Sequence, residues 1–306
     1  MSQKSGLIPG WGVAAPSATG YQVPEGKSEL VNRNSIIFTI GRSISLIGDG
    51  FYLQTLVVWG AAFTLANATT PAQRTTAPLV IAGIQATILA SYYLGNFLIV
   101  PFASIFADRL NRRSVMITAN LIQAVLSLLP LGAFLAARGL FLPTIYISFF
   151  ILNGFAGLFV AAQGGALQVI VSRRTIPQAI SILYILFGVG NVLGAVFASP
   201  FFLAVGPIIA ILFNAATFVV SAISLALIRM PDQALNPRKY QPTGTVAGAV
   251  IGKVLKELGQ GFRFAFTTRV LLACALMIFV GALGGSAIQS SFSGFFFANL
   301  HANPRT

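Results

Sequence analysis

The stretch "SIFADRLNRR", residues 104–113, brings together four charged side chains in a chain of which only 8% is charged. It holds one acid, Asp108, and three arginines, Arg109, Arg112 and Arg113. Long apolar runs lie on both sides of it. A short charged stretch between two such runs indicates a point at which the chain leaves an apolar medium and turns back into it.

The composition supports the same interpretation. The chain has 306 residues, is 56% hydrophobic and has a mean hydropathy of +0.84. A water-soluble core of this size does not enclose so much apolar material, which indicates an integral membrane protein. A span needs roughly 20 apolar residues and must be helical in lipid. Seven segments meet this requirement: 35–66, 79–107, 115–137, 144–171, 180–204, 207–228 and 270–300. We therefore predict an all-α polytopic membrane protein.

The basic residues predict the orientation of the spans. If the amino terminus is cytoplasmic, sixteen of the 19 Lys and Arg residues fall in or next to inner segments, and only Arg74, Arg138 and Arg305 fall outside. This bias predicts a multi-pass protein of the cell (inner) membrane with a cytoplasmic amino terminus. The net charge of +13 thus reflects insertion, and because the cations are dispersed over separate loops we expect no nucleic-acid partner.

The spans divide the chain into four parts. We predict a disordered cytoplasmic tail over 1–34, a six-helix bundle over 35–228, a cytoplasmic loop over 229–269, and a seventh helix over 270–306 that starts a truncated second bundle. Within the loop, apolar residues from Ile251 to Phe266 recur at helical spacing opposite basic ones. This pattern fits an amphipathic helix on the inner membrane surface. It fits a linker helix packed under the bundle equally well.

Other kinds of chemistry find no support in the sequence. Cys274 and His301 are the only residues of their types, so a metal cluster is not expected, and no phosphate-binding GxxxxGK[ST] motif is present. No nucleophile has a general base nearby in the sequence. We predict a protein that is not an enzyme and needs no cofactor; Cys274 is expected to be a packing residue.

The opening stretch resembles the signature loop of major facilitator superfamily transporters, G-x-x-x-D-R-x-G-R-R. Asp108, Arg109, Arg112 and Arg113 match this pattern, whereas Ser104 and Asn111 replace its two glycines. Asn111 tolerates the left-handed backbone that a glycine there would adopt, so the turn can survive this replacement. The runs "SISLIGDGFYLQTLVVW", "VSRRTIPQAISILYILFGVGNVLGAVFASP" and "KELGQGFRFAFTTRVL" are similar to the enterobactin-exporter-like branch of the superfamily.

The resemblance implies two six-helix bundles that work by alternating access, and efflux of a siderophore- or drug-like molecule. It also implies that Asp108, Arg109, Arg112 and Arg113 form a conformational latch at the inner ends of the helices. The alternative is a turn whose arginines merely obey the positive-inside rule. Two features depart from the family pattern: the fourth span lacks an arginine, and the fifth span lacks a Gly-Pro pair. Proton antiport is therefore not implied by the resemblance alone.

One acid, Asp49, lies near the middle of a span. A carboxylate at that depth costs about 3 kcal/mol unless it is protonated, paired or beside water, so its default interpretation is a coupling site for protons or another cation. Arg42 precedes it by two helical turns, which places both on one face, too far apart for a direct salt bridge. The alternative is that Arg42 marks the end of the helix and Asp49 makes a structural hydrogen bond.

Neutral polar and small residues complete the candidate set. Gln54, Asn153 and Asn191 are candidates for the coupling or substrate cavity, although any one of them can instead join two helices. Gly190, Gly194 and Pro200 are predicted to serve helix packing in the fifth span.

Two functions remain open at this stage. The first is a secondary transporter that exports a small amphipathic molecule. The second is a degenerate relative that acts as a structural or assembly subunit of a membrane complex. Twelve spans are expected for a complete carrier, so we expect the chain to be a fragment or to pair with a second half-transporter or a larger complex. Membrane lipids and a small-molecule substrate are the other expected partners.

Overall fold

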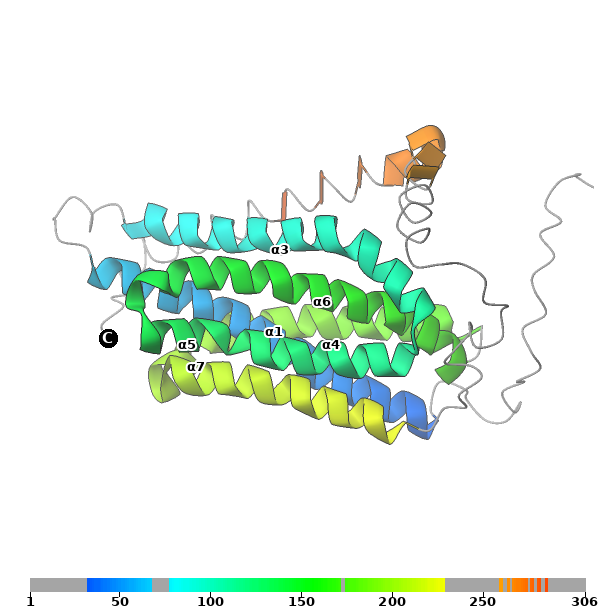
Figure 1. Cartoon of the computed structure of the whole chain (residues 1–306), viewed down its shortest axis with the longest axis horizontal. Helices are drawn as coiled ribbons and strands as arrows, with labels where there is room; N and C mark the ends of the chain where they lie inside the picture. Colours follow the sequence, from blue (N-terminus) through cyan, green and yellow to red (C-terminus); the bar gives the residue numbers. More distant parts are fainter. Residues whose placement is uncertain are drawn as a thin grey trace, which may run out of the picture.

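The computed structural model describes residues 32–67, 77–171 and 174–228, together with scattered residues between 259 and 285. The described part is entirely helical. Its elements are α1 (Arg33–Ala66), α3 (Ala77–Arg109), α4 (Arg112–Ser127), α5 (Leu129–Ala136), a short 3-10 helix (Arg138–Leu140), α6 (Phe141–Ile170) and α7 (Ile176–Leu227) (Figure 1). The predicted all-helical membrane fold is confirmed.

The long helix α7 contains two predicted spans. Gly206 interrupts it with φ 82° and ψ 165°, a backbone conformation that side chains other than glycine's rarely adopt. The chain turns back there, so that α7 consists of a first arm, residues 176–205, and a second arm, residues 207–227, that run in opposite directions (Figure 1).

The lengths and composition of the helices fit a membrane. Among the described residues, five segments are long and apolar enough to span one: Arg33–Thr64, Arg112–Ala136, Arg138–Gln168, Ile176–Gly194 and Ala204–Leu227. In addition, the 33 residues of α3 carry charges only at its last two positions, Asp108 and Arg109. Each of these segments satisfies its backbone hydrogen bonds internally, as lipid requires.

Two buried clusters hold the bundle together. One includes Phe38, Met116, Phe159 and Leu225, and the other includes Tyr52, Phe141, Phe149 and Phe218. In each cluster, side chains of α1, α6 and the second arm of α7 meet. The bundle core therefore depends on α1, which packs on α7, while α3 packs on α6.

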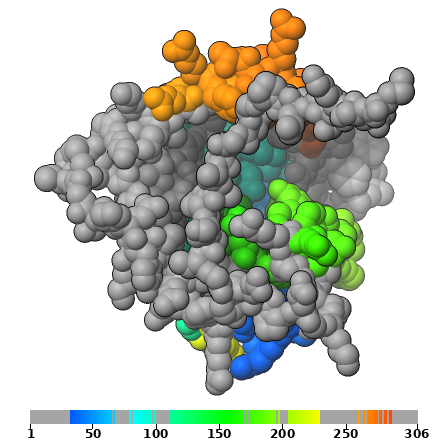
Figure 2. Space-filling model, turned by 90° about the vertical axis from the view of Figure 1, so that its right-hand side faces the viewer, coloured from blue at the N-terminus to red at the C-terminus, as the bar shows by residue number. Residues whose placement is uncertain are grey.

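One end of the bundle gathers several helix termini. The start of α1, the start of α4, the end of α6 and both ends of α7 lie there (Figure 1). Figure 2 looks onto this end and shows the start of α1 in blue beside the end of α7 in yellow. The predicted tail, most of the predicted loop 229–269 and most of the predicted seventh helix lie outside the described residues, so these divisions of the chain stay predictions.

Candidate functional site

The turn between α3 and α4 is built by Asn111. Its Oδ1 atom accepts hydrogen bonds from the backbone N–H groups of Arg113, at 3.0 Å, and Ser114, at 3.3 Å, which caps the amino end of α4. Its backbone has φ −62° and ψ 112°, an extended conformation. The turn survives the replacement of glycine, but not through the left-handed backbone that asparagine tolerates: the side chain of Asn111 caps a helix, and a capping residue takes an extended conformation.

Arg112 and Arg113 bind the ends of two other helices. Arg112 donates from Nη1 to the carbonyl oxygen of Gly165 in α6, 3.0 Å away. Arg113 donates from Nε to the carbonyl oxygen of Leu225, 3.1 Å away, and from Nη2 to that of Ala226. Leu225 and Ala226 lie in the last turn of α7, where carbonyls lack regular intrahelical partners and carry the negative end of the helix dipole, so the guanidinium of Arg113 stabilises them. Gly165 lies five residues before the end of α6, so Arg112 binds α6 beside its last turn.

Asn32 makes a matching contact at the same end. Its Oδ1 atom accepts from the backbone N–H of Ser35 at 2.7 Å, and its Nδ2 atom donates to the carbonyl oxygen of Ile170 at 2.7 Å. One side chain thus caps the start of α1 and the end of α6. We call Asn32, Arg112 and Arg113 together the end clasp, because they join the termini of α1, α4, α6 and α7.

Asp108 and Arg109 form the end of α3, and their side chains lie outside the described part of the chain. The hydrogen bonds of Arg112 to Gly165 and of Arg113 to Leu225 and Ala226 are internal to this bundle. The latch formed by Asp108, Arg109, Arg112 and Arg113 therefore stays a prediction.

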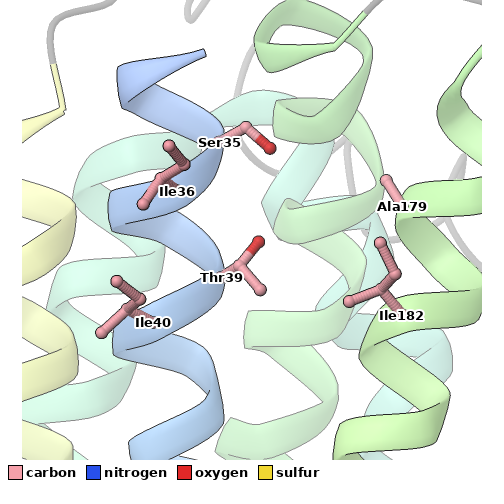
Figure 3. Close-up of a pocket in the computed structure, with 6 residues that line it drawn as sticks. All are labelled: Ser35, Ile36, Thr39, Ile40, Ala179 and Ile182. Atoms are coloured by element: carbon pink, nitrogen blue, oxygen red, sulfur yellow. The ribbon is translucent and has the colours of Figure 1, made fainter. Parts of the chain in front are cut away.

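A polar stripe runs along α1 from this end into the bundle. Ser35, Thr39, Arg42 and Asp49 follow one another at intervals of four, three and seven residues, which places them on one helical face. Near the end of the bundle, Ser35 and Thr39 line a groove of about 220 Å³ together with Ile36, Ile40, Ala179 and Ile182. The two hydroxyl groups lie on the side of α1 that faces Ala179 and Ile182 of α7 (Figure 3).

Arg42 lies deeper along the stripe, against an aromatic ring. Its guanidinium carbon is 4.5 Å from the ring centroid of Phe159 on α6, a cation–π contact. Its Nη1 atom donates to the hydroxyl oxygen of Ser45, 3.4 Å away. The guanidinium is thus held between α1 and α6.

Asp49 stands at the middle of α1 and is partly exposed, as is Arg42. Within the described residues neither side chain forms an ion pair, and Asp49 makes no hydrogen bond. The charges of Arg42 and Asp49 nevertheless interact electrostatically, and the phenol of Tyr92 on α3 interacts with both. Arg42, Asp49, Tyr92 and Phe159 therefore form one charged and aromatic site among α1, α3 and α6, which we call the α1 site.

The other predicted cavity residues lie elsewhere. Gln54 follows Asp49 by five residues, so its position on α1 is about 140° around the helix axis from that of Asp49. Asn153 is buried, donates to the carbonyl oxygen of Phe149 at 2.8 Å, and its Oδ1 atom lies 3.5 Å from Asn96 Nδ2 on α3. Asn191 donates within its own helix to the carbonyl oxygen of Phe187 at 2.8 Å.

Sequence reasoning missed Tyr92 and Phe159. The signal for them was an arginine within a span, because such an arginine needs an acid or an aromatic face beside it.

The fifth-span glycines lie against the backbone of α1. A Cβ atom on Gly190 would come within 2.7 Å of the Leu46 carbonyl oxygen, and one on Gly194 would collide with the backbone of Gly50. The side chain of Pro200, the third predicted packing residue, is outside the described part. This close approach fixes the position of Asp49 along the axis of the first arm of α7, because Asp49 directly precedes Gly50.

The fold and the α1 site define a multi-pass helical membrane protein with an ionisable site inside its bundle, which is the architecture of a membrane carrier. Comparison with protein families identifies it further: the Major Facilitator Superfamily matches residues 38–303, and the chain belongs to that superfamily of membrane transporters. Comparison with curated proteins and with solved structures finds no match.

Proposed function

We propose that this protein is a secondary active transporter that exports a small amphipathic molecule by alternating access, with Asp49 as the carboxylate that couples transport to protons or another cation. Membership of the superfamily supports transport. Export, the amphipathic substrate, kinship with the enterobactin-exporter-like branch and location in a bacterial inner membrane are our proposal, which rests on the sequence patterns described above.

The observation that carries this proposal is the state of Asp49. A carboxylate halfway along a 34-residue helix that is partly exposed, and that is neither hydrogen-bonded nor ion-paired among the described residues, is costly in a bilayer. A structural acid at this depth would be expected to hold two helices together through hydrogen bonds. A coupling acid must instead remain accessible, because it has to gain and lose a cation during each cycle.

The arrangement of the helices supports alternating access. In the proposed cycle the groove lined by Ser35 and Thr39 opens toward the cytoplasm, and the polar stripe of α1 leads from it to Asp49. The end clasp holds the termini of α1, α4, α6 and α7 as one unit, so that the bundle moves as a rigid body. Asp108 and Arg109 at the end of α3 then provide the part of the latch that is made and broken against a second bundle, contributed by a longer chain or by a second copy. The outer faces, rich in exposed Leu, Ile, Val and Phe, contact lipid.

Transport in vesicles tests the role of Asp49. The full chain is reconstituted, and uptake of the fluorescent dye rhodamine B ethyl ester is measured with and without a pH gradient. Asp49→Glu keeps a titratable group and is expected to retain gradient-dependent uptake, whereas Asp49→Asn is expected to lose it. If Asp49→Asn transports with the same dependence on the gradient as the unchanged chain, Asp49 is not the coupling group.

Cysteine labelling tests the proposed orientation. Cys274 is exposed in the structure and not a packing residue as expected, so the test uses a Cys274→Ser background. In it, a cysteine placed at Ser114, next to the end clasp and exposed, is expected to react with a membrane-impermeant reagent only from the cytoplasmic side. Reaction from the outer side would reverse the topology and remove the inner latch.

A further inference from the structure

We propose that the molecule bound at the α1 site is dipolar: it carries an anionic group that binds Arg42 and, about 10 Å away, a basic group that pairs with Asp49. This inference rests on the proposed function of Asp49 and adds the chemical class of the substrate.

The surroundings of Arg42 favour an anionic ligand. The Phe159 ring supports one face of the guanidinium, and Ser45 accepts from Nη1 at the long distance of 3.4 Å. A guanidinium has five N–H donors, whose planar edge matches a carboxylate. Among the described residues no acid lies within ion-pair distance of Arg42. A partly exposed, oriented guanidinium at this depth is therefore suited to bind an anion presented from the site.

Asp49 provides the opposite charge at a fixed distance. Seven residues separate it from Arg42, which corresponds to a rise of about 10 Å along one face of α1. The two charges interact electrostatically without closing into a pair. A ligand with only a cationic group would leave the guanidinium of Arg42 uncompensated inside the membrane, which is costly, and one with only an anionic group would require Asp49 to be protonated. A dipolar ligand of matching length compensates both charges at once.

The rest of the α1 site suits the body of such a molecule. Tyr92 lies near both charges, and Phe159 forms the wall beside Arg42. Leu46, between Arg42 and Asp49, is buried, and its backbone lies against Gly190 of the first arm of α7. Between its two charges the ligand therefore meets aromatic rings, which favours an aromatic or other flat apolar body.

This substrate class explains how binding and coupling share one residue. The basic group of the ligand occupies Asp49 only when the carboxylate is ionised, so the ligand and a proton compete for it. Such competition makes the two move in opposite directions, as export driven by an inward proton gradient requires.

Two matched dyes test the proposal. Rhodamine B carries a carboxylate and a delocalised cation on a rigid aromatic frame, and its ethyl ester carries only the cation. Binding of both to the full chain in detergent is followed by fluorescence polarisation at neutral pH. We expect rhodamine B to bind at least tenfold more tightly than the ester. We expect Arg42→Gln to abolish this preference while the affinity for the ester stays within about twofold.

Arg138→Gln is the matched control, because Arg138 also lies over a phenylalanine ring, Phe134 at 5.6 Å, but at the opposite end of the bundle. It should leave the preference unchanged. If Arg42→Gln does not fold, Arg42→Lys decides: losing the planar donor edge should lower the preference at least threefold. Equal binding of the two dyes, no binding of either, or a preference unaffected by the substitution of Arg42 overturns the proposal. Gradient-dependent uptake that Asp49→Asn abolishes would keep the proposed function in each of these cases, so the two proposals are judged by separate measurements.

Discussion

Arg113, the last residue of the charged stretch 104–113, donates from Nε to the carbonyl oxygen of Leu225, 3.1 Å away and 112 positions later in the chain. The contact joins the start of α4 to the end of the second arm of α7. Leu225 and Ala226 belong to the last turn of that arm, where carbonyl groups lack the regular helical partner four residues later. The stretch thus has a structural role within the bundle in addition to any role in the transport cycle.

Replacing Arg113 tests this structural role. Arg113→Ala removes charge-assisted hydrogen bonds to two carbonyls and should lower the free energy of unfolding by about 2 kcal/mol. Unfolding in mixed detergent, followed by circular dichroism, measures the change. Arg138→Ala is the control, since Arg138 is exposed at the other end of the bundle, and should change stability by less than about 0.5 kcal/mol. Equal losses in the two variants would argue against a specific contact with α7.

Asn111 gives a prediction that distinguishes a helix cap from a left-handed turn. Because its side chain caps α4, Asn111→Ala should destabilise the protein by about 1 kcal/mol, whereas Asn111→Asp should be nearly neutral. Asn111→Gly, which restores the family's residue, should cost a few tenths of a kcal/mol rather than stabilise. The same unfolding measurement ranks the three variants. A stabilised glycine variant would mean that the backbone at this position is left-handed after all.

The sequence predicts the spans well and the site only in part, for physical reasons. Long apolar runs set the helix positions directly, and Gly206 lies between the two spans predicted on either side of it, because only glycine adopts that turn without strain. The signature motif does not predict the backbone at Asn111. Its position in the motif suggests a glycine-like conformation, but its side chain instead accepts from two backbone N–H groups at the start of α4. An arginine within a span signals an acid or an aromatic partner, but the sequence does not say that the partner is Phe159, since 117 positions separate the two residues and only the packing of α6 on α1 brings them together.

The contact between α1 and the first arm of α7 gives a third prediction. Gly190→Ala would place a methyl group within 2.7 Å of the carbonyl oxygen of Leu46, so the helices must separate. Overpacking of this kind costs about 1–3 kcal/mol. Transport should fall as well, because the shift displaces Asp49. Gly188→Ala is a matched control two residues away, where an added Cβ meets nothing within 4 Å. Thermal unfolding and dye uptake should therefore separate the two alanine variants; similar behaviour would contradict the close backbone contact.

A polar contact inside the bundle provides the last prediction. Asn120 on α4 donates from Nδ2 to the hydroxyl oxygen of Ser221 on α7, 2.9 Å away, and both side chains are buried. Hydrogen bonds between membrane helices contribute about 1 kcal/mol, which a double-mutant cycle measures directly. Ser221→Ala should cost about that amount in the unchanged chain and close to nothing in the Asn120→Leu background.

Ser224 supplies the control for this cycle. Its hydroxyl group donates within its own helix to the carbonyl oxygen of Val220, 2.9 Å away, so Ser224→Ala should have the same effect with Asn120 or Leu at position 120. A coupling energy for Asn120 and Ser221 no larger than that for Asn120 and Ser224 would show that this contact does not join α4 to α7. A larger one would establish that α4 is bound to the second arm of α7 in mid-bundle as well as at the end clasp, because Arg113 and Asn120 lie two turns apart on the same face of α4.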